Sequence, residues 1–160
     1  MVILRRFVAF AVAVALTLAL ASAAATQGAL AALAPLEVSA PVSFALRLET
    51  TLSDFLGLLA VGTVPVAVTV ALALGWSIAG LVLWRLPSTR AEALRGLGYI
   101  LAGALAMMAM HVLLRLAFDG IVPMAATRTT LGLLLQGVAG AIGGGIFAYL
   151  TRAPRSAVAP

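Results

Sequence analysis

The chain has 160 residues, of which 64% are apolar and only 9% are charged. Soluble domains carry about a quarter charged residues, so this composition excludes a water-soluble globular protein and predicts an integral membrane protein. The chain has no Cys and one His. These counts exclude disulfides, iron–sulfur clusters and multi-histidine metal sites, and we predict no cofactor, no metal and no nucleic-acid partner.

Four stretches are long enough and apolar enough to cross a membrane, which takes about 20 residues for roughly 30 Å of hydrocarbon. They are residues 7–25, 55–84, 97–118 and 130–150. We therefore expect an all-α integral membrane four-helix bundle that forms a single transmembrane domain over residues 1–160.

The first stretch has two interpretations. Its basic start at Arg5 and Arg6, its apolar run and the triplet Ala21-Ser22-Ala23 together fit a secretory signal peptide cleaved near residue 23. The apolar run is longer than a usual signal-peptide core, however, and the alanine-rich sequence continues beyond it. We therefore favour a retained anchor, and the intact mass of the protein distinguishes the two.

Residues 26–53 form the largest predicted segment outside the spans. Phe44, Leu48 and Leu52 recur every four residues, which is typical of a short helix lying in the membrane interface. The segment from Val42 to Leu48 also alternates as a strand would, but a lone strand there would leave backbone groups unpaired. We therefore prefer the interfacial helix.

The second stretch, residues 55–84, would make about 45 Å of helix, which is longer than the hydrocarbon layer. Pro65 removes one backbone N–H and its ring clashes with the preceding turn. We expect the helix to bend at Pro65.

Arginine positions predict the orientation, because Lys and Arg near span ends are retained on the cytoplasmic side. With the N-terminus inside, Arg47 and Arg128 are outside and Arg115 lies within a span. The cytoplasmic arginines are then Arg5, Arg6, Arg85, Arg90, Arg95, Arg152 and Arg155. This bias predicts a multi-pass protein of the bacterial inner membrane with both termini in the cytoplasm. Trp84, Tyr99 and Tyr149 are expected at the cytoplasmic interface, where amphipathic rings prefer to lie.

Two ridges of small residues run along the fourth stretch, in the manner of a glycine zipper. They are Gly140, Gly144 and Ala148, and Gly137, Ala141 and Gly145. Small residues at this spacing let helices approach closely in lipid. Packing inside the chain's own bundle is the favoured interpretation, and a surface for a homo-oligomer or a larger membrane complex is the alternative.

A set of polar residues near the predicted outer ends of the spans forms the candidate ligand site, because polar groups inside a membrane are costly and often functional. His111, Arg115 and Asp119 are spaced by four on one helix face. The other members of the candidate site are Gln136, Thr63 and Asp54. Such a cluster suits a lipid headgroup, a quinone-like molecule or an anion, with Arg115 as the charge and His111 as donor or proton carrier. The structural alternative is that His111 and Gln136 only hydrogen-bond between helices while Arg115 pairs with Asp119.

Three functional hypotheses follow. The first is a non-enzymatic accessory or scaffold subunit that acts through helix packing, and the second is a small transporter or ligand-binding protein that uses the polar cluster. The third is aspartyl hydrolysis by Asp54 and Asp119, since the chain resembles lipoprotein signal peptidases in length, span number and topology. Their Asn-containing motifs are absent because the chain has no Asn. We therefore assign no family, no catalytic residue and no enzymatic activity.

Overall fold

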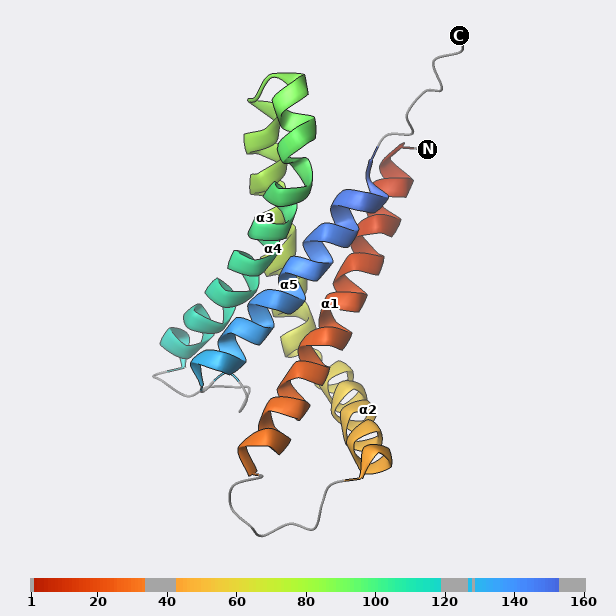
Figure 1. The fold of residues 1–160 in the computed structure, drawn as a ribbon, viewed down its shortest axis with the longest axis vertical. Coiled ribbons are helices and arrows are strands. Elements are labelled where there is room, and N and C mark those ends of the chain that lie inside the picture. Colours follow the sequence, from red (N-terminus) through yellow and green to blue (C-terminus); the bar gives the residue numbers. More distant parts are fainter. Residues whose placement is uncertain (1, 34–42, 119–126, 128, 153–160) are drawn as a thin grey trace.

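The computed structural model describes residues 2–33, 43–118, 127 and 129–152. Within these residues the chain is all-helical, and its helices are α1 (Val2–Leu33), α2 (Phe44–Val61), α3 (Thr63–Trp84), α4 (Ser88–Ala117) and α5 (Thr130–Leu150) (Figure 1). Four of them, α1, α3, α4 and α5, are long and apolar enough to cross a membrane. The prediction of an all-α protein with four candidate spans is confirmed.

Local sequence explains where two of the helices begin. The Ser43 hydroxyl accepts a hydrogen bond from the Leu46 backbone N–H at 3.2 Å, and the Thr129 hydroxyl accepts one from Gly132 at 3.0 Å. Each hydroxyl satisfies a donor that the first turn of a helix leaves free. Helices α2 and α5 therefore start where their sequences supply an N-cap.

The structure corrects the expected single helix over residues 55–84. The chain breaks at Gly62, whose φ of 74° ends α2 and precedes α3. Pro65 is the third residue of α3, where its missing N–H would have had no intrahelical partner. The bend therefore lies at Gly62, because glycine alone adopts a positive φ without steric cost, and Pro65 starts a new helix instead of bending an old one.

Replacing Gly62 by Ala is expected to lower the free energy of unfolding by about 1 kcal/mol, because a Cβ at this φ meets the backbone. Gly57→Ala is the matched control, since Gly57 lies inside α2 with nothing within 4 Å of the added carbon. Thermal unfolding followed by circular dichroism in detergent measures both. Equal midpoints for the two variants would contradict the assignment of Gly62 as the required hinge.

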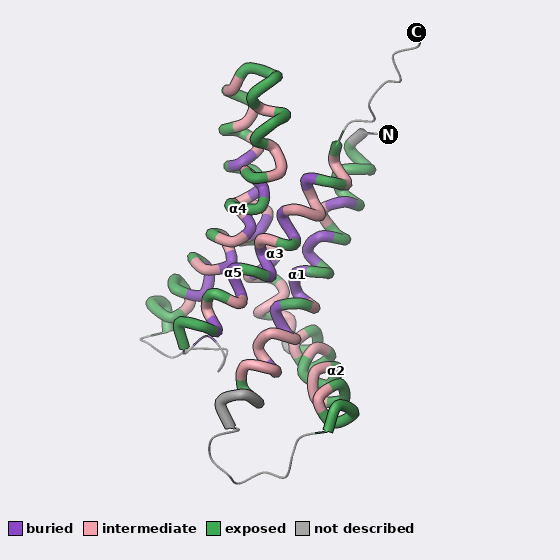
Figure 2. The backbone as a smooth tube through the Cα atoms, in the orientation of Figure 1, coloured by how far each residue is buried: buried purple, intermediate pink, exposed green. Residues whose placement is uncertain are grey.

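The four candidate spanning helices form a row rather than a closed square. Helix α5 packs most extensively on α4, while α3 extends the row from α4 and α1 extends it from α5. Helices α1 and α3 barely meet. Buried residues accordingly gather where the helices cross, and the outer ends of the helix pairs are largely exposed (Figure 2).

Glycines set the short distance between α4 and α5. A Cβ on Gly103 would overlap the carbonyl oxygen of Gly140, and a Cβ on Gly140 would overlap that of Gly103. One turn further along α5, a Cβ on Gly144 would overlap the Tyr99 carbonyl. Gly143 makes the corresponding close approach to the hydroxyl of Thr17 in α1. These glycine faces are therefore occupied by helices of the same chain.

The two predicted ridges of α5 differ in burial. Gly137, Gly140, Gly144 and Ala148 are buried, and Gly137 would bring a Cβ to 3.0 Å from the Met108 sulfur. Two further members of the ridges, Ala141 and Gly145, are only partly buried. The more buried side of α5 therefore faces α4 and α1.

Candidate functional site

The polar residues of the predicted site are distributed over several places. His111 and Gln136 are both buried, and their side chains are neighbours between α4 and α5. Gln136 Nε2 donates a hydrogen bond of 2.9 Å to the carbonyl oxygen of Ala21, which also links α5 to α1. His111 Nε2 and Gln136 Oε1 are buried and have no partner of standard hydrogen-bond geometry.

These two unpaired atoms are chemically complementary. Since Gln136 Nε2 must face the Ala21 carbonyl, the amide oxygen is left to accept, and an imidazole protonated at Nε2 can donate to it. A small side-chain movement then satisfies both groups. The pair is thus suited to fixing the register of α1, α4 and α5, because an unpaired polar group is costly in an apolar interior.

A double-mutant cycle on His111→Leu and Gln136→Leu is expected to give a coupling energy of about 0.6 kcal/mol and at most about 1.7 kcal/mol, the average and the largest value for hydrogen bonds between membrane helices. The measurement is the free energy of unfolding of the wild type, both single variants and the double variant in detergent. The control cycle pairs Arg115→Leu with Gln136→Leu and should give a coupling near zero, because Arg115 is exposed. Equal coupling in both cycles would show that His111 and Gln136 do not interact.

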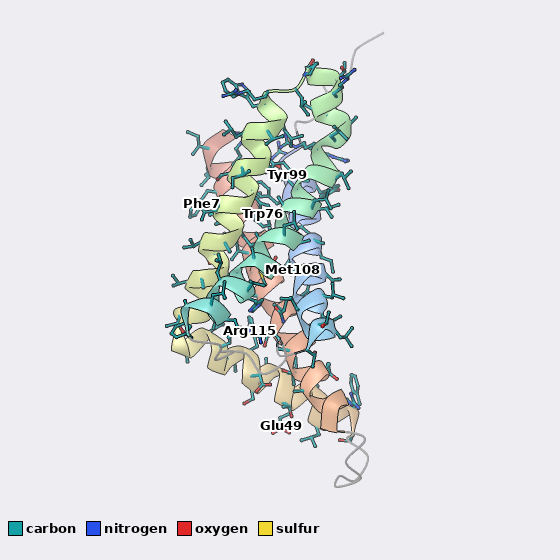
Figure 3. The ribbon with its side chains drawn as sticks, turned by 90° about the vertical axis from the view of Figure 1, so that its left-hand side faces the viewer. Phe7, Glu49, Trp76, Tyr99, Met108 and Arg115 are labelled. Atoms are coloured by element: carbon teal, nitrogen blue, oxygen red, sulfur yellow. The ribbon has the colours of Figure 1, made fainter. Side chains whose placement is uncertain are left out.

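The remaining members of the predicted site do not join this pair. Thr63 is exposed at the start of α3, and Arg115 is exposed near the end of α4 (Figure 3). Asp54 lies on α2, where its Oδ2 accepts a 2.7 Å hydrogen bond from the Thr26 hydroxyl of α1. Asp119, the predicted partner of Arg115 and of Asp54, lies outside the described residues.

A polar network next to Asp54 fastens α2 to the end of α1. Arg47 Nη1 donates to Gln27 Oε1 at 2.9 Å, and Gln27 Nε2 donates to the Thr51 hydroxyl at 3.2 Å. Together with the Thr26–Asp54 bond, this network spans two turns of α2. The polar side chains of this network are therefore bonded to one another and hold α1 and α2 together.

A large cavity lies at the opposite end, where α1 begins and α5 ends; we call this the terminal end. The cavity has a volume of about 1450 Å³ and opens between the α3–α4 pair and the α1–α5 pair. The residues that line it include Arg6, Leu83, Trp84, Glu92, Arg95 and Arg152. A second cavity of about 360 Å³ shares Gly80, Tyr99 and Phe147 with it and reaches further along the helices. We call the two adjoining cavities the terminal cleft.

Two arginines bind the C-terminal end of α5 at the terminal cleft, and one of them, Arg95, links the two sides of the cleft. Arg5 of α1 donates through Nε and Nη2 to the Leu150 carbonyl at 3.1 and 2.9 Å, and through Nη2 to the Arg152 carbonyl. Arg95 of α4 donates through Nη2 to the carbonyl and hydroxyl oxygens of Thr151 at 3.2 and 2.9 Å. Both arginines thus bind free carbonyl groups at the C-terminus of α5, where the helix dipole also favours positive charge.

The inner part of the terminal cleft is aromatic. Trp76 stacks on Phe147 with ring centres 4.8 Å apart, and Phe10 meets Trp76 edge-on at 5.7 Å. Tyr99 packs edge-on against Phe147 at 5.1 Å, and the guanidinium of Arg95 lies 5.5 Å from the Tyr99 ring centre. Figure 3 shows Trp76 and Tyr99 at neighbouring levels of the bundle. The cleft therefore changes from cationic at the terminal end to apolar toward the middle of the bundle.

Sequence reasoning missed this cleft and misplaced one of its residues. Trp84 and Tyr149 are exposed, as expected of interfacial rings, but Tyr99 is buried with 8% of its surface exposed. The reason is that α4 begins at Ser88 instead of near residue 97, so that Tyr99 lies three turns inside the helix. The sequence does hold a signal for the cleft: Phe10, Trp76 and Phe147 each lie within about two and a half helical turns of an arginine near the terminal end, which places all three rings in the same half of the bundle.

Comparisons of the chain with protein-family models, with curated proteins and with solved structures each found no match.

Proposed function

We propose that this protein is a small, non-enzymatic, multi-pass protein of the bacterial inner membrane that binds a membrane-embedded amphipathic molecule in the terminal cleft. The observation that carries the proposal is the cleft itself. It lies between the α3–α4 pair and the α1–α5 pair, beside two helices, α1 and α3, that make few contacts, and it combines cationic side chains with an aromatic interior. Such an arrangement matches a molecule with a polar head and an apolar body.

The proposed orientation has the terminal end in the cytoplasm. Six arginines on described residues support it, since they lie at or near that end: Arg5, Arg6, Arg85, Arg90, Arg95 and Arg152. Arginine near short loops is retained on the cytoplasmic side during insertion. The terminal cleft would then open at the level of the cytoplasmic leaflet.

The test uses the intact protein purified from its native membrane in mild detergent and examined by native mass spectrometry. We expect a stoichiometric adduct with the mass of a lipid-like molecule. Gly80→Phe should abolish the adduct, because Gly80 lines both cavities and the only atom within 4 Å of an added Cβ is the Tyr99 hydroxyl at 3.2 Å.

Gly96→Phe is the matched control, because Gly96 is not among the lining residues and has open space around an added Cβ. It should retain the adduct. Circular dichroism establishes that both variants are folded. Wild-type protein free of any adduct, or an adduct retained by folded Gly80→Phe, would overturn the proposed function.

A second candidate role is that of an accessory subunit, and helix α2 is the observation that favours it. Phe44, Leu48, Leu52 and Leu56 form an exposed apolar row along α2, with exposed fractions between 57% and 81%. The helix projects from the bundle at the end opposite the terminal cleft (Figure 1). A stoichiometric protein in the same mass spectra, lost on Leu52→Glu, would support this role in place of lipid binding.

A further inference from the structure

The terminal cleft carries an excess of positive charge that the protein itself does not neutralise. Arg6, Arg95 and Arg152 line it from α1, from α4 and from the residues after α5, and Glu92 is the one acidic residue on its wall within the described chain. None of the three arginines pairs with a carboxylate among the described residues. The cationic end is therefore available to an anionic group from outside.

Arg95 is the most informative of the three. Its Nη2 is occupied by the two oxygens of Thr151, but its Nε is buried and has no hydrogen-bond partner. A buried N–H that lacks an acceptor is costly, and an acceptor placed in the cleft would remove that cost. The orientation of the Arg95 guanidinium is also restricted, because this group lies over the Tyr99 ring.

We propose that the terminal cleft binds an anionic phospholipid of the cytoplasmic leaflet, with its phosphate held by Arg6, Arg95 and Arg152 and its acyl chains lying against Trp76 and Phe147. This inference rests on the proposed function and names the chemical class of its ligand. Planar guanidinium groups bind phosphate oxygens in pairs, which makes arginine the side chain suited to this anion.

The order of groups along the cleft matches a phospholipid. The arginines lie at the ends of their helices, where headgroups are, and the aromatic rings lie deeper, where acyl chains are. The volume of about 1450 Å³ exceeds the roughly 300–1,000 Å³ of pockets for small molecules. The cytoplasmic leaflet also carries the negative surface potential, and basic pockets between helices on that side are suited to anionic headgroups.

The test follows contact between lipid and the floor of the cleft. Trp84→Phe leaves Trp76 as the single tryptophan, and the full-length variant is reconstituted in phosphatidylcholine vesicles with rising fractions of phosphatidylglycerol brominated on its acyl chains. Bromine quenches Trp76 fluorescence on contact. We expect quenching at low fractions of the anionic lipid. The preference for it over brominated phosphatidylcholine should be about a hundredfold, since each of the three arginines proposed to hold the phosphate contributes about a fivefold preference.

Two charge-matched variants in the same background decide whether the cleft is responsible. Arg6→Gln/Arg152→Gln removes two lining charges whose side chains make no hydrogen bond within the described protein, and it should reduce the preference about 25-fold. Arg85→Gln/Arg90→Gln removes the same charge from the same end, outside the cleft lining, and should keep most of the preference.

The outcomes separate the inference from the proposed function on which it rests. If both brominated lipids quench Trp76 equally, the cleft binds lipid but the anionic class is wrong. If the two double variants lose the preference for anionic lipid equally, general surface charge explains that preference, and the assignment of the phosphate site to the terminal cleft is wrong. If inorganic phosphate abolishes the preference, the site takes a free anion instead of a lipid. If neither lipid quenches Trp76, both the inference and the proposed function fail.

Discussion

Gly103→Ala is expected to lower the free energy of unfolding by about 1–3 kcal/mol, although it adds a single methyl group to a helix. The added carbon would overlap the carbonyl oxygen of Gly140 in α5 and would lie 3.2 Å from Trp76 Nε1 in α3. A backbone carbonyl inside a helix cannot rotate away, so α4 and α5 must separate. Separation weakens the most extensive helix contact of the protein.

Gly96→Ala is the control in the same helix. A Cβ there has nothing within 4 Å, so only helix propensity changes, and the variant should be unchanged or more stable by up to about 1 kcal/mol. Reversible unfolding in detergent and denaturant mixtures measures both free energies. The same loss for both variants would mean that the α4–α5 contact does not depend on the absence of a side chain at Gly103.

Trp76→Ala is expected to cost about 3–5 kcal/mol, the range for removing a buried large aromatic side chain. Trp76 is 3% exposed and packs against Phe147 of α5 and Phe10 of α1. Because α1 and α3 otherwise barely meet, this aromatic cluster is a main connection from α3 to the far side of the row. Its loss should therefore loosen α3 as well as leave a cavity.

Trp84→Ala is the matched control, since the second tryptophan of the chain is 75% exposed at the end of the same helix. We expect a change of no more than about 0.5 kcal/mol for this variant. The unfolding free energies of both variants are measured by circular dichroism. Tryptophan fluorescence is unsuitable as the probe, because each variant lacks one of the two tryptophans. A small effect at Trp76 would show that the cleft floor is not part of the stabilising core.

The sequence predicts part of the candidate polar site correctly. Counting residues from the span ends brings His111 and Gln136 to similar depths, and the structure brings them together. The same counting grouped Arg115, Thr63 and Asp54 with them, and the structure does not. Depth along a helix can be counted, but the direction in which a side chain points depends on how each helix is rotated against its neighbours.

For the bend between α2 and α3, too, the sequence predicts that it exists but not where it lies. The length of residues 55–84 already required a bend or an extension beyond the bilayer, and Pro65 was the strongest local signal for it. The bend instead falls at Gly62, and the residues before it belong to the helix that starts at Ser43. Gly62 and Pro65 both favour a helix boundary. Which of them becomes the boundary depends on the contacts that α2 makes with α1.

The number of candidate spanning helices follows from composition alone, because hydrocarbon tolerates no unpaired backbone and each apolar stretch must satisfy its own hydrogen bonds as a helix. The order in which these helices pack does not follow from composition, because most of the surface of each candidate span is apolar and lipid does not distinguish one apolar face from another. Close contacts such as Gly103 with Gly140 determine that order. The terminal cleft is a consequence of that order, since it lies where α1 and α3 make few contacts with each other.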